Sequence, residues 1–388
     1  MAGHTSSLLL RQTVPDGTGT PARADDVTLN SAEATNGLHR ICPQHFRAAL
    51  TASGKPVTRA FRIAGHAVRL HFADDVIARR LTRAFAHLEG DTQEPELTVN
   101  AWQSTGIAAP PLPAIHSDAA TRGAVAHFDD GRARALYQPA IRILNVLDVP
   151  QDVGWFWTED AAGIPEWECA TPIRHILHWW LAERGAQQVH AAAVGNKSGG
   201  VLVVGKGGSG KSTVSLACAT AGMAYAGDDY VAATVTPEPY VHSLYSSAKV
   251  EPHHLLRFPA LSEGPGVVRP ERSEVAPFDT EKTVLYLHEL RPDVPVSGFP
   301  LRAIVLPKIT ESGTSGLAPI SAPRALAALA PSTIVQLHTA GQDALEAMKR
   351  LVAEVPSFEL ELGGEIDAIA PLVSQLLTDL GSDGTAGR

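Results

Sequence analysis

The segment VLVVGKGGSGKSTVSLACA, near the middle of the chain, constrains the fold more than any other stretch. It satisfies the pattern G-x-x-x-x-G-K-[ST], with a β-type apolar run before it and a helical pattern after it. Glycines let backbone N–H groups turn inward around an anion, and the N-terminus of the following helix adds a favourable dipole. The sequence therefore predicts an α/β fold that holds phosphates at a strand-to-helix turn.

The whole loop is a candidate nucleotide-binding segment. We expect Lys211 to reach the β- and γ-phosphates and the Ser212 hydroxyl to ligate Mg²⁺, so ATP and Mg²⁺ are the expected cofactors. A glycine-rich turn that binds nothing is the alternative. The residues assigned to nucleotide binding are Gly205, Lys206, Gly207, Gly208, Ser209, Gly210, Lys211, Ser212 and Thr213.

Two adjacent carboxylates, Asp228 and Asp229, follow 17 and 18 residues after Lys211. The gap holds one helix, a stop at Gly222 and one short strand. If that strand runs parallel to the strand before the loop, its carboxyl end lies at the same edge of the sheet. One carboxylate could then hold Mg²⁺ and the other accept a proton from an attacking hydroxyl. The short gap disfavours motors and transporters, and a helix cap or solvated turn is the alternative.

His190 lies 21 residues before Lys211, at the start of the hairpin that leads into the loop. A lone histidine in an apolar strand is usually a packed residue. Its spacing from the loop makes it a candidate for the same site.

The stretch VHAAAVGNKSGGVLVVGKGGSGKSTVSLACATAGMAYAGDDYV resembles the catalytic core of HPr serine kinase/phosphorylase, in which a histidine, a phosphate loop and an Asp-Asp pair have these spacings. The resemblance implies a fold like phosphoenolpyruvate carboxykinase, with a mixed sheet around the loop, and transfer of the γ-phosphate to a serine hydroxyl. It implies that Asp229 is the proton acceptor and that Lys211 and His190 are active-site residues. It also implies Mg²⁺ binding by Ser212, with Asp228 as a second carboxylate and metal ligand.

The chain departs from that family at several positions. Thr213 stands where the family usually has Glu, and the family's Glu-x-Arg-Gly stretch, which is linked to phosphorolysis, has no clear counterpart. At the corresponding distance the chain reads SLYSSAKVEPHHLLRF, where Glu251 lies in a different context. Lys249 is a candidate contact for phosphate or substrate, with a solvated surface lysine as the alternative.

A second resemblance covers the phrases IPEWECATPIRHILHW, VHAAAVG, YAGDDYV and SLYSSAKV. They are similar to divergent HPr-kinase-like proteins, some of which are associated with peptide-modification pathways. There the acceptor is a hydroxyl on a small peptide, whereas the named family phosphorylates a carrier protein. The resemblance leaves a homo-oligomer open and suggests substrate recognition for the N-terminal part.

Composition and charge limit the classes of partner that we expect for this chain. The formal net charge is −9 without a Lys/Arg-rich block, so we expect no nucleic acid. No apolar run is long enough to cross a membrane. The three cysteines are far apart, which suits a reducing cytoplasm. The expected organisation is a disordered leader (1–38), an α+β domain (39–165), an HPr-kinase-like P-loop catalytic domain (166–380) and a flexible tail (381–388).

Periodicity predicts several further elements. We expect a helix that is capped by Thr171, with Pro172 in its first turn, and a core of tryptophans between the domains, with ligand stacking as the alternative role. The tryptophans are Trp155, Trp157, Trp167, Trp179 and Trp180. Expected strands are 57–63, 66–72, 97–102, 143–149, 201–205, 223–227, 283–290 and 301–307, with a hairpin around the Asp-Gly turn at 130–131; expected helices are 74–88, 344–355 and 367–380.

The sequence therefore predicts an ATP- and Mg²⁺-dependent kinase that phosphorylates a Ser or Thr hydroxyl of a protein or peptide. Two alternatives stay open: a kinase for a small-molecule hydroxyl, and a non-catalytic module that senses ATP. An open acceptor groove would favour a peptide and a closed pocket a metabolite. Loss of the proton acceptor would favour a sensor.

Overall fold

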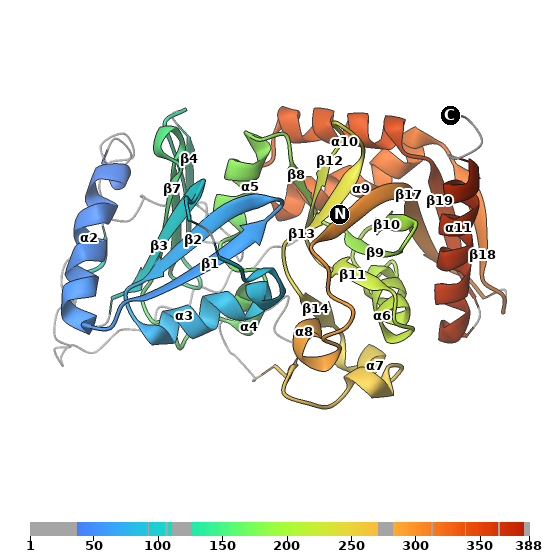
Figure 1. Cartoon of the computed structure of the whole chain (residues 1–388), viewed down its shortest axis with the longest axis horizontal. Coiled ribbons are helices and arrows are strands. Elements are labelled where there is room, and N and C mark those ends of the chain that lie inside the picture. The colour runs from blue at the N-terminus through green and yellow to red at the C-terminus, as the bar shows by residue number, and fades with distance from the viewer. Residues whose placement is uncertain are drawn as a thin grey trace, which may run out of the picture.

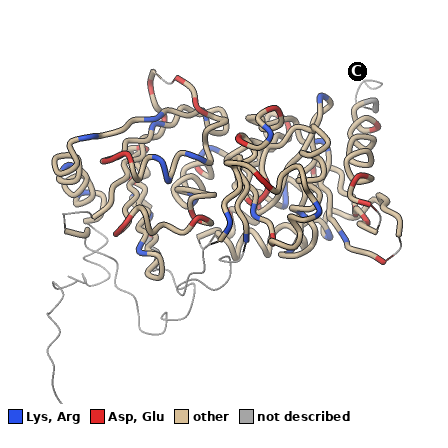
Figure 2. The backbone as a smooth tube through the Cα atoms, turned by 90° about the horizontal axis from the view of Figure 1, so that it is seen from below, with Lys and Arg blue, Asp and Glu red and all other residues tan. Residues whose placement is uncertain are grey.

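The computed structural model describes residues 37–91, 93–104, 108–110, 126–129, 131–270, 282–311, 313–337, 339–363 and 365–383. The structure is mixed α/β, and its sheets contain both parallel and antiparallel neighbours. One sheet lies in the N-terminal part of the chain, and two lie in the C-terminal part (Figure 1). Lys, Arg, Asp and Glu are spread over both parts (Figure 2).

The N-terminal sheet has seven strands in the order β1-β2-β3-β7-β6-β5-β4. The expected hairpin β1–β2 turns at Ala64-Gly65, both at positive φ, and β4–β5 pair antiparallel around Gly131. β2, β3 and β7 run parallel, which the strand patterns alone did not indicate. The strands are β1 (Val57–Ile63), β2 (His66–Phe72), β3 (Leu97–Gln103), β4 (Ala126–Asp129), β5 (Ala133–Gln138), β6 (Ile143–Asp148) and β7 (Val153–Thr158).

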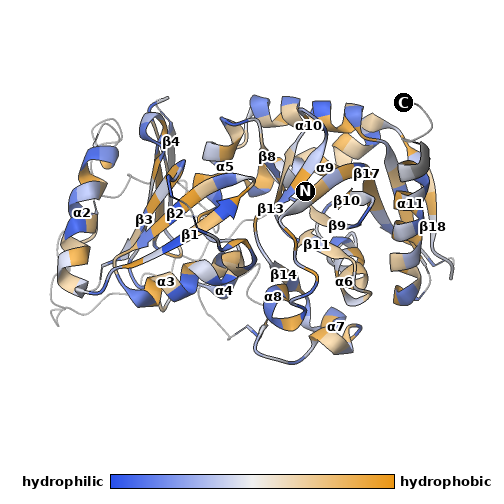
Figure 3. Ribbon diagram, in the orientation of Figure 1, coloured by the Kyte–Doolittle hydropathy of each residue, from blue (hydrophilic) through white to orange (hydrophobic). Residues whose placement is uncertain are grey.

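Helices cover both faces of this sheet. The helix expected at 74–88 is α3 (Asp75–Thr82) followed by the 3₁₀ helix η1 (Arg83–Leu88). Asp74 caps α3, because its carboxylate accepts the N–H groups of Val76 and Ile77. On the other face lies α2 (Leu38–Ser53), for which the sequence analysis made no assignment. Hydrophobic and hydrophilic residues alternate around α3, as expected for a helix with one buried side (Figure 3).

The larger C-terminal sheet has nine strands. Its main path is β11-β9-β10-β17-β13-β12-β8, and β19 and β18 continue from β17 on a branch. β10 pairs parallel with β17, and β17 pairs parallel with β19. The strands are β8 (Gln187–Val189), β9 (Ala192–Asn196), β10 (Gly199–Val203), β11 (Ala224–Gly227), β12 (Val231–Thr234), β13 (Tyr240–Ser243), β17 (Gly298–Ile309), β18 (Gly316–Ile320) and β19 (Ser357–Leu362).

Helices pack on both faces of the nine-stranded sheet (Figure 1). Along β10, Val201 and Val203 face α6 and α11, whereas Leu202 faces α9 and α10, as the two-residue period of a strand dictates. The helices are α6 (Lys211–Thr220), α9 (Ala322–Gln336), α10 (Gln342–Glu354) and α11 (Ile369–Asp383), which follows η5 (Ile366–Ala368).

A small sheet, β14-β16-β15, lies beside α6 and carries the short helices α7 and α8. The strand expected at 283–290 is only half strand, because the chain turns into α8 after Tyr286. The elements are β14 (Ser247–Val250), α7 (Pro252–Leu255), η4 (Pro259–Leu261), β15 (Val267–Val268), β16 (Thr283–Tyr286) and α8 (Leu287–Leu290).

The expected N-cap at Thr171 is wrong. The helix is α5 (Arg174–Ala182), and the residue before it is Ile173 in the left-handed region at φ 50°. The Thr171 hydroxyl instead donates to the carbonyl of Trp167 in the short helix α4 (Glu166–Cys169). The buried ion pair between Arg174 and Glu168, at 2.6 Å, holds the start of α5 against α4.

The expected tryptophan core is split between two clusters. Trp155 and Trp157 pack with α2 on the outer face of the N-terminal sheet. Trp179 and Trp180, on α5, belong to a core that also contains Tyr230 and Leu337 from the C-terminal part. Of these four tryptophans, the α5 pair therefore lies between the two parts of the chain.

Two expectations concern the chain ends. Most of the leader, residues 1–36, lies outside the described residues, and α2 begins at Leu38. α11 continues to Asp383, past residue 380 where we expected the catalytic domain to end, and 384–388 lie outside the described residues.

Candidate phosphate-transfer site

The glycine-rich loop connects the end of β10 to the start of α6, as the sequence predicts. Three of its glycines, Gly205, Gly208 and Gly210, have positive φ, a conformation that L side chains rarely adopt. A Cβ on Gly205 would lie 2.5 Å from the Ser209 hydroxyl. The backbone of the loop therefore requires glycine at these positions.

Lys211, the first residue of α6, is buried with its ammonium folded back over the loop. Its Nζ donates to the carbonyl oxygens of Gly205 at 2.8 Å and Lys206 at 3.3 Å. Burial lowers the pKa of the ammonium, and the carboxylates of Asp228 and Asp229 oppose this shift only in part. A positive charge thus lies on the inner side of the loop, close to both carboxylates.

The strand directions bring the carboxylates to the loop. β11 runs antiparallel to β9, and β9 runs antiparallel to β10, so β11 and β10 point the same way although they are not neighbours. Their carboxyl ends therefore lie at one edge of the sheet, as expected. Asp228 and Asp229 directly follow β11 at this edge.

Asp229 is held by two cationic or hydrogen-bonding groups. Its Oδ1 lies 3.0 Å from His190 Nε2, and its Oδ2 lies 2.7 Å from Lys249 Nζ. Burial alone would raise the pKa of Asp229, but Lys249 and His190 outweigh burial and hold that pKa well below its ordinary value. The Asp229 side chain remains 21% exposed, so an incoming group can still reach the carboxylate.

Asp228 is buried and faces α6. Its Oδ1 accepts the Ser215 hydroxyl at 2.8 Å, and Ser212 also donates to it. Burial raises the pKa of Asp228 above its ordinary value, against these two hydrogen bonds. The two neighbouring carboxylates therefore differ. Asp228 is buried beside the Ser212 hydroxyl, whereas Asp229 is partly exposed and contacts His190 and Lys249.

His190 is anchored to α9. Its backbone N–H donates to Thr333 Oγ1 at 3.1 Å, and its ring lies 5.6 Å from the ring of Tyr230. The Tyr230 hydroxyl in turn donates to Gln336 Oε1 at 3.3 Å, also on α9. The nitrogen that faces away from Asp229, Nδ1, is buried and makes no hydrogen bond.

The structure thus brings together the loop, His190, Asp228, Asp229 and Lys249. Thr213 is half-buried in the first turn of α6, and Glu251 precedes α7 outside this arrangement. Ser215 and Thr333 were missed by the sequence analysis. The position of Ser215 four residues after Lys211 on a helix could have indicated it, whereas nothing in the sequence connects Thr333 with His190.

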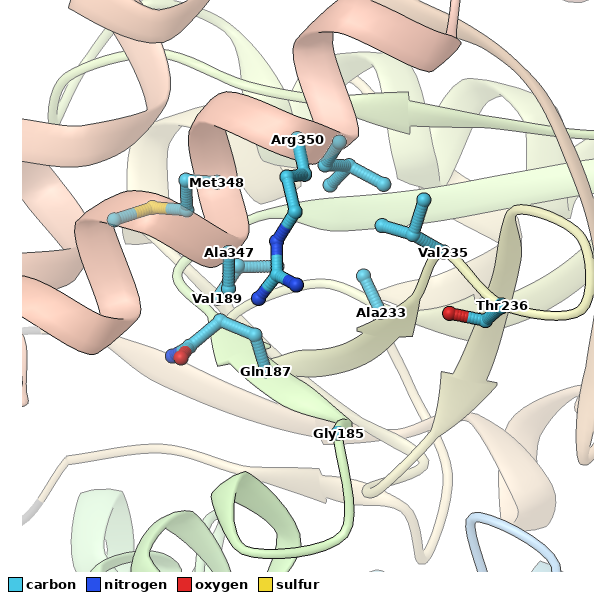
Figure 4. Close-up of a pocket in the computed structure, with 10 residues that line it drawn as sticks. Gly185, Gln187, Val189, Ala233, Val235, Thr236, Ala347, Met348 and Arg350 are labelled. Atoms are coloured by element: carbon cyan, nitrogen blue, oxygen red, sulfur yellow. The ribbon is translucent and has the colours of Figure 1, made fainter.

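Two cavities lie along the nine-stranded sheet. One of about 550 Å³ borders the loop, and the residues that line it come from the loop, the end of β17, α9 and β19. Another of about 90 Å³ lies between β8, β12 and α10, where the Arg350 side chain extends toward Gln187 (Figure 4). The smaller cavity is at the end of β12 remote from Asp229.

Among the described residues, no group of three or more His, Cys, Asp and Glu is arranged to hold a metal ion. In the same part of the chain, no helix combines the length and apolar content that crossing a bilayer requires.

No protein-family model matches the sequence, and no curated protein matches it significantly. Among solved structures, the chain is similar to the Hpr(Ser) kinase/phosphatase from Coxiella burnetii, at 12% sequence identity and a TM-score of 0.25. The similarity covers 51% of this chain and 99% of that chain.

Proposed function

We propose that the protein is an ATP- and Mg²⁺-dependent kinase that transfers the γ-phosphate to a Ser or Thr hydroxyl of a protein or peptide. The observation that carries this proposal is the convergence of Lys211 on the loop with the Asp229 carboxylate, which His190 and Lys249 hold. Binding and transfer of phosphate need positioned cations and a carboxylate at the acceptor.

The loop fits a phosphate chain. Its glycine conformations direct the backbone around an anion, and Lys211 supplies a positive charge. Ser209 Oγ is buried without a hydrogen-bond partner in the structure and lines the adjoining cavity, so it offers a further donor. The loop residues Gly205 to Thr213 would hold the triphosphate by these groups.

Mg²⁺ fits the Ser212 and Asp228 pair. A hydroxyl and a carboxylate in hydrogen-bonding contact are the hard oxygen ligands that Mg²⁺ prefers, together with phosphate oxygens and water. When bound, Mg²⁺ would neutralise charge on the phosphates. Ser215 holds Asp228 in place by its hydrogen bond.

Asp229 would orient the acceptor hydroxyl and accept its proton as the new P–O bond forms. Its low pKa keeps it ionised, and each carboxylate oxygen can accept a further hydrogen bond beside those from His190 and Lys249. This intact arrangement favours catalysis over an ATP sensor, which needs no proton acceptor.

The acceptor class rests on the resemblance to HPr-kinase-like proteins, and a small-molecule hydroxyl is the competing acceptor. We propose that residues 166–380 form the catalytic domain, that residues 39–165 form a separate domain that recognises the acceptor, and that the chain acts in the cytoplasm, with a homo-oligomer left open. Core residues from both parts pack together, which would keep the two domains in contact.

The test is to incubate the wild-type protein with γ-labelled ATP, Mg²⁺ and cell extract, and to identify the labelled acceptor by mass spectrometry. Asp229→Asn should lower transfer about 1,000-fold while the dissociation constant for ATP changes little. Asp293→Asn is the matched control, because Asp293 is an exposed carboxylate paired with Arg291. Transfer by Asp229→Asn at the wild-type rate would contradict the proposal.

A further inference from the structure

The cavity of about 550 Å³ beside the loop has one wall made by a single face of α9. The α9 residues that line it lie at positions i, i+3, i+4, i+7 and i+8, which is one continuous side of a helix. Apart from the first, they are small or ring-shaped and leave a flat surface. They are Arg324, Ala327, Ala328, Pro331 and Ser332.

The other lining residues come from the end of β17, from the loop itself and from Glu359 of β19. Leu306, Pro307 and Ile309 supply apolar surface, and Ile309 is 68% exposed. Four loop residues, including Ser209, line both this cavity and the path of the phosphates. The cavity is therefore continuous with the phosphate site.

Lys308, Arg324 and Glu359, which line the cavity, form ion pairs. Lys308 Nζ lies 3.1 Å from Glu359 and 3.3 Å from Glu361, and Arg324 also pairs with Glu359. These pairs neutralise Lys308 and Arg324, and the further cation in the lining, Lys206, belongs to the glycine-rich loop. A wall of small apolar residues beside paired charges suits an uncharged aromatic ring rather than another phosphate.

We propose that this cavity binds the nucleoside of the triphosphate, with the purine ring between the Ala327–Ala328–Pro331 face of α9 and the end of β17. The inference rests on the proposed function, because it takes the loop as the phosphate site. The volume of the cavity lies within the range of about 300–1,000 Å³ that is usual for small-molecule sites. A side chain of the acceptor is the competing occupant.

The test measures the dissociation constants of MgATP and of Mg-tripolyphosphate by titration calorimetry. Ala328→Trp fills the cavity, so it should weaken ATP binding at least tenfold and leave tripolyphosphate binding within twofold. Val335→Trp is the matched control on the same helix, because Val335 is 70% exposed and lies outside the cavity lining. Unchanged ATP affinity in Ala328→Trp would overturn the nucleoside site.

Photo-crosslinking of the wild-type protein with 8-azido-ATP gives a second measurement that needs no variant. The label should appear on residues 306–309 or 324–332, and labelling only elsewhere would overturn the proposal. If tripolyphosphate does not bind the wild-type protein, or binds Lys211→Ala equally well, the phosphate site and thus the proposed function fails instead. The two failures are therefore distinguishable.

Discussion

The two sides of the glycine-rich loop are built from different kinds of residue. On the acidic side, His190 and Lys249 are largely buried, and each contacts Asp229, at 3.0 and 2.7 Å. On the cavity side, α9 contributes mostly small residues, the end of β17 adds apolar side chains, and the cation Lys308 is 50% exposed. Buried charges in fixed contact suit chemistry that needs an oriented carboxylate, whereas a smooth apolar wall suits binding of a ring.

The largest difference between the sides should appear when a lysine is removed from each. Lys249→Met keeps the side-chain volume but leaves Asp229 without its buried counter-charge, and the carboxylate should lose its orientation. We expect kcat for phosphate transfer to fall about 100-fold. The matched variant Lys308→Met removes a half-exposed lysine that pairs with Glu359 and Glu361, and it should leave kcat within about twofold.

Steady-state kinetics of both variants with the same acceptor checks this contrast. If kcat fell equally in Lys249→Met and Lys308→Met, the burial of the Lys249–Asp229 pair would not matter for phosphate transfer. A change confined to KM in Lys249→Met would place Lys249 in binding rather than in the orientation of Asp229.

A second contrast lies within the loop. Gly205→Ala introduces a Cβ at φ 147°, 2.5 Å from Ser209 Oγ, whereas Gly207→Ala meets no atom within 4 Å and has no positive φ. Gly205→Ala should cost about 1–3 kcal/mol of stability and weaken ATP binding, while Gly207→Ala should stay within about 0.5 kcal/mol. Urea unfolding and ATP titration measure both effects, and similar losses in the two variants would contradict the strain argument.

The acidic side could be predicted from the sequence, since its main residues lie within one segment at fixed spacings. The expectation depended on this strand running parallel to the strand before the loop, and β11 does run that way. His190, Lys211, Asp228 and Asp229 meet at one edge of the sheet. Lys249 was identified as a candidate, although its pairing with Asp229 was not.

The cavity side could not be predicted, because its residues come from three elements that lie more than 90 residues after the loop and follow no motif. α9 was not recognised: Pro331 is unfavourable inside a helix, and its many alanines give little contrast between an apolar and a polar face. In the N-terminal part, the parallel strands β2, β3 and β7 were missed because strand patterns carry no direction. Contacts made by tertiary packing alone leave no local signal.

α9 contacts both sides of the loop, and this makes Thr333 informative. Its hydroxyl accepts the backbone N–H of His190 and donates to the Leu329 carbonyl, so it fixes the strand connection that positions His190 against Asp229. Thr333→Val keeps the shape but removes one neutral hydrogen bond, which is worth about 1 kcal/mol, so kcat should fall roughly fivefold. Thr333→Ser should restore kcat, and the KM for ATP should change in neither variant.

Thr82→Val is the matched control, since Thr82 makes the same bond to the carbonyl four residues earlier on α3. If Thr333→Val instead raised KM for ATP with kcat unchanged, α9 would serve the cavity side alone, and the separation between the two sides of the loop would be complete.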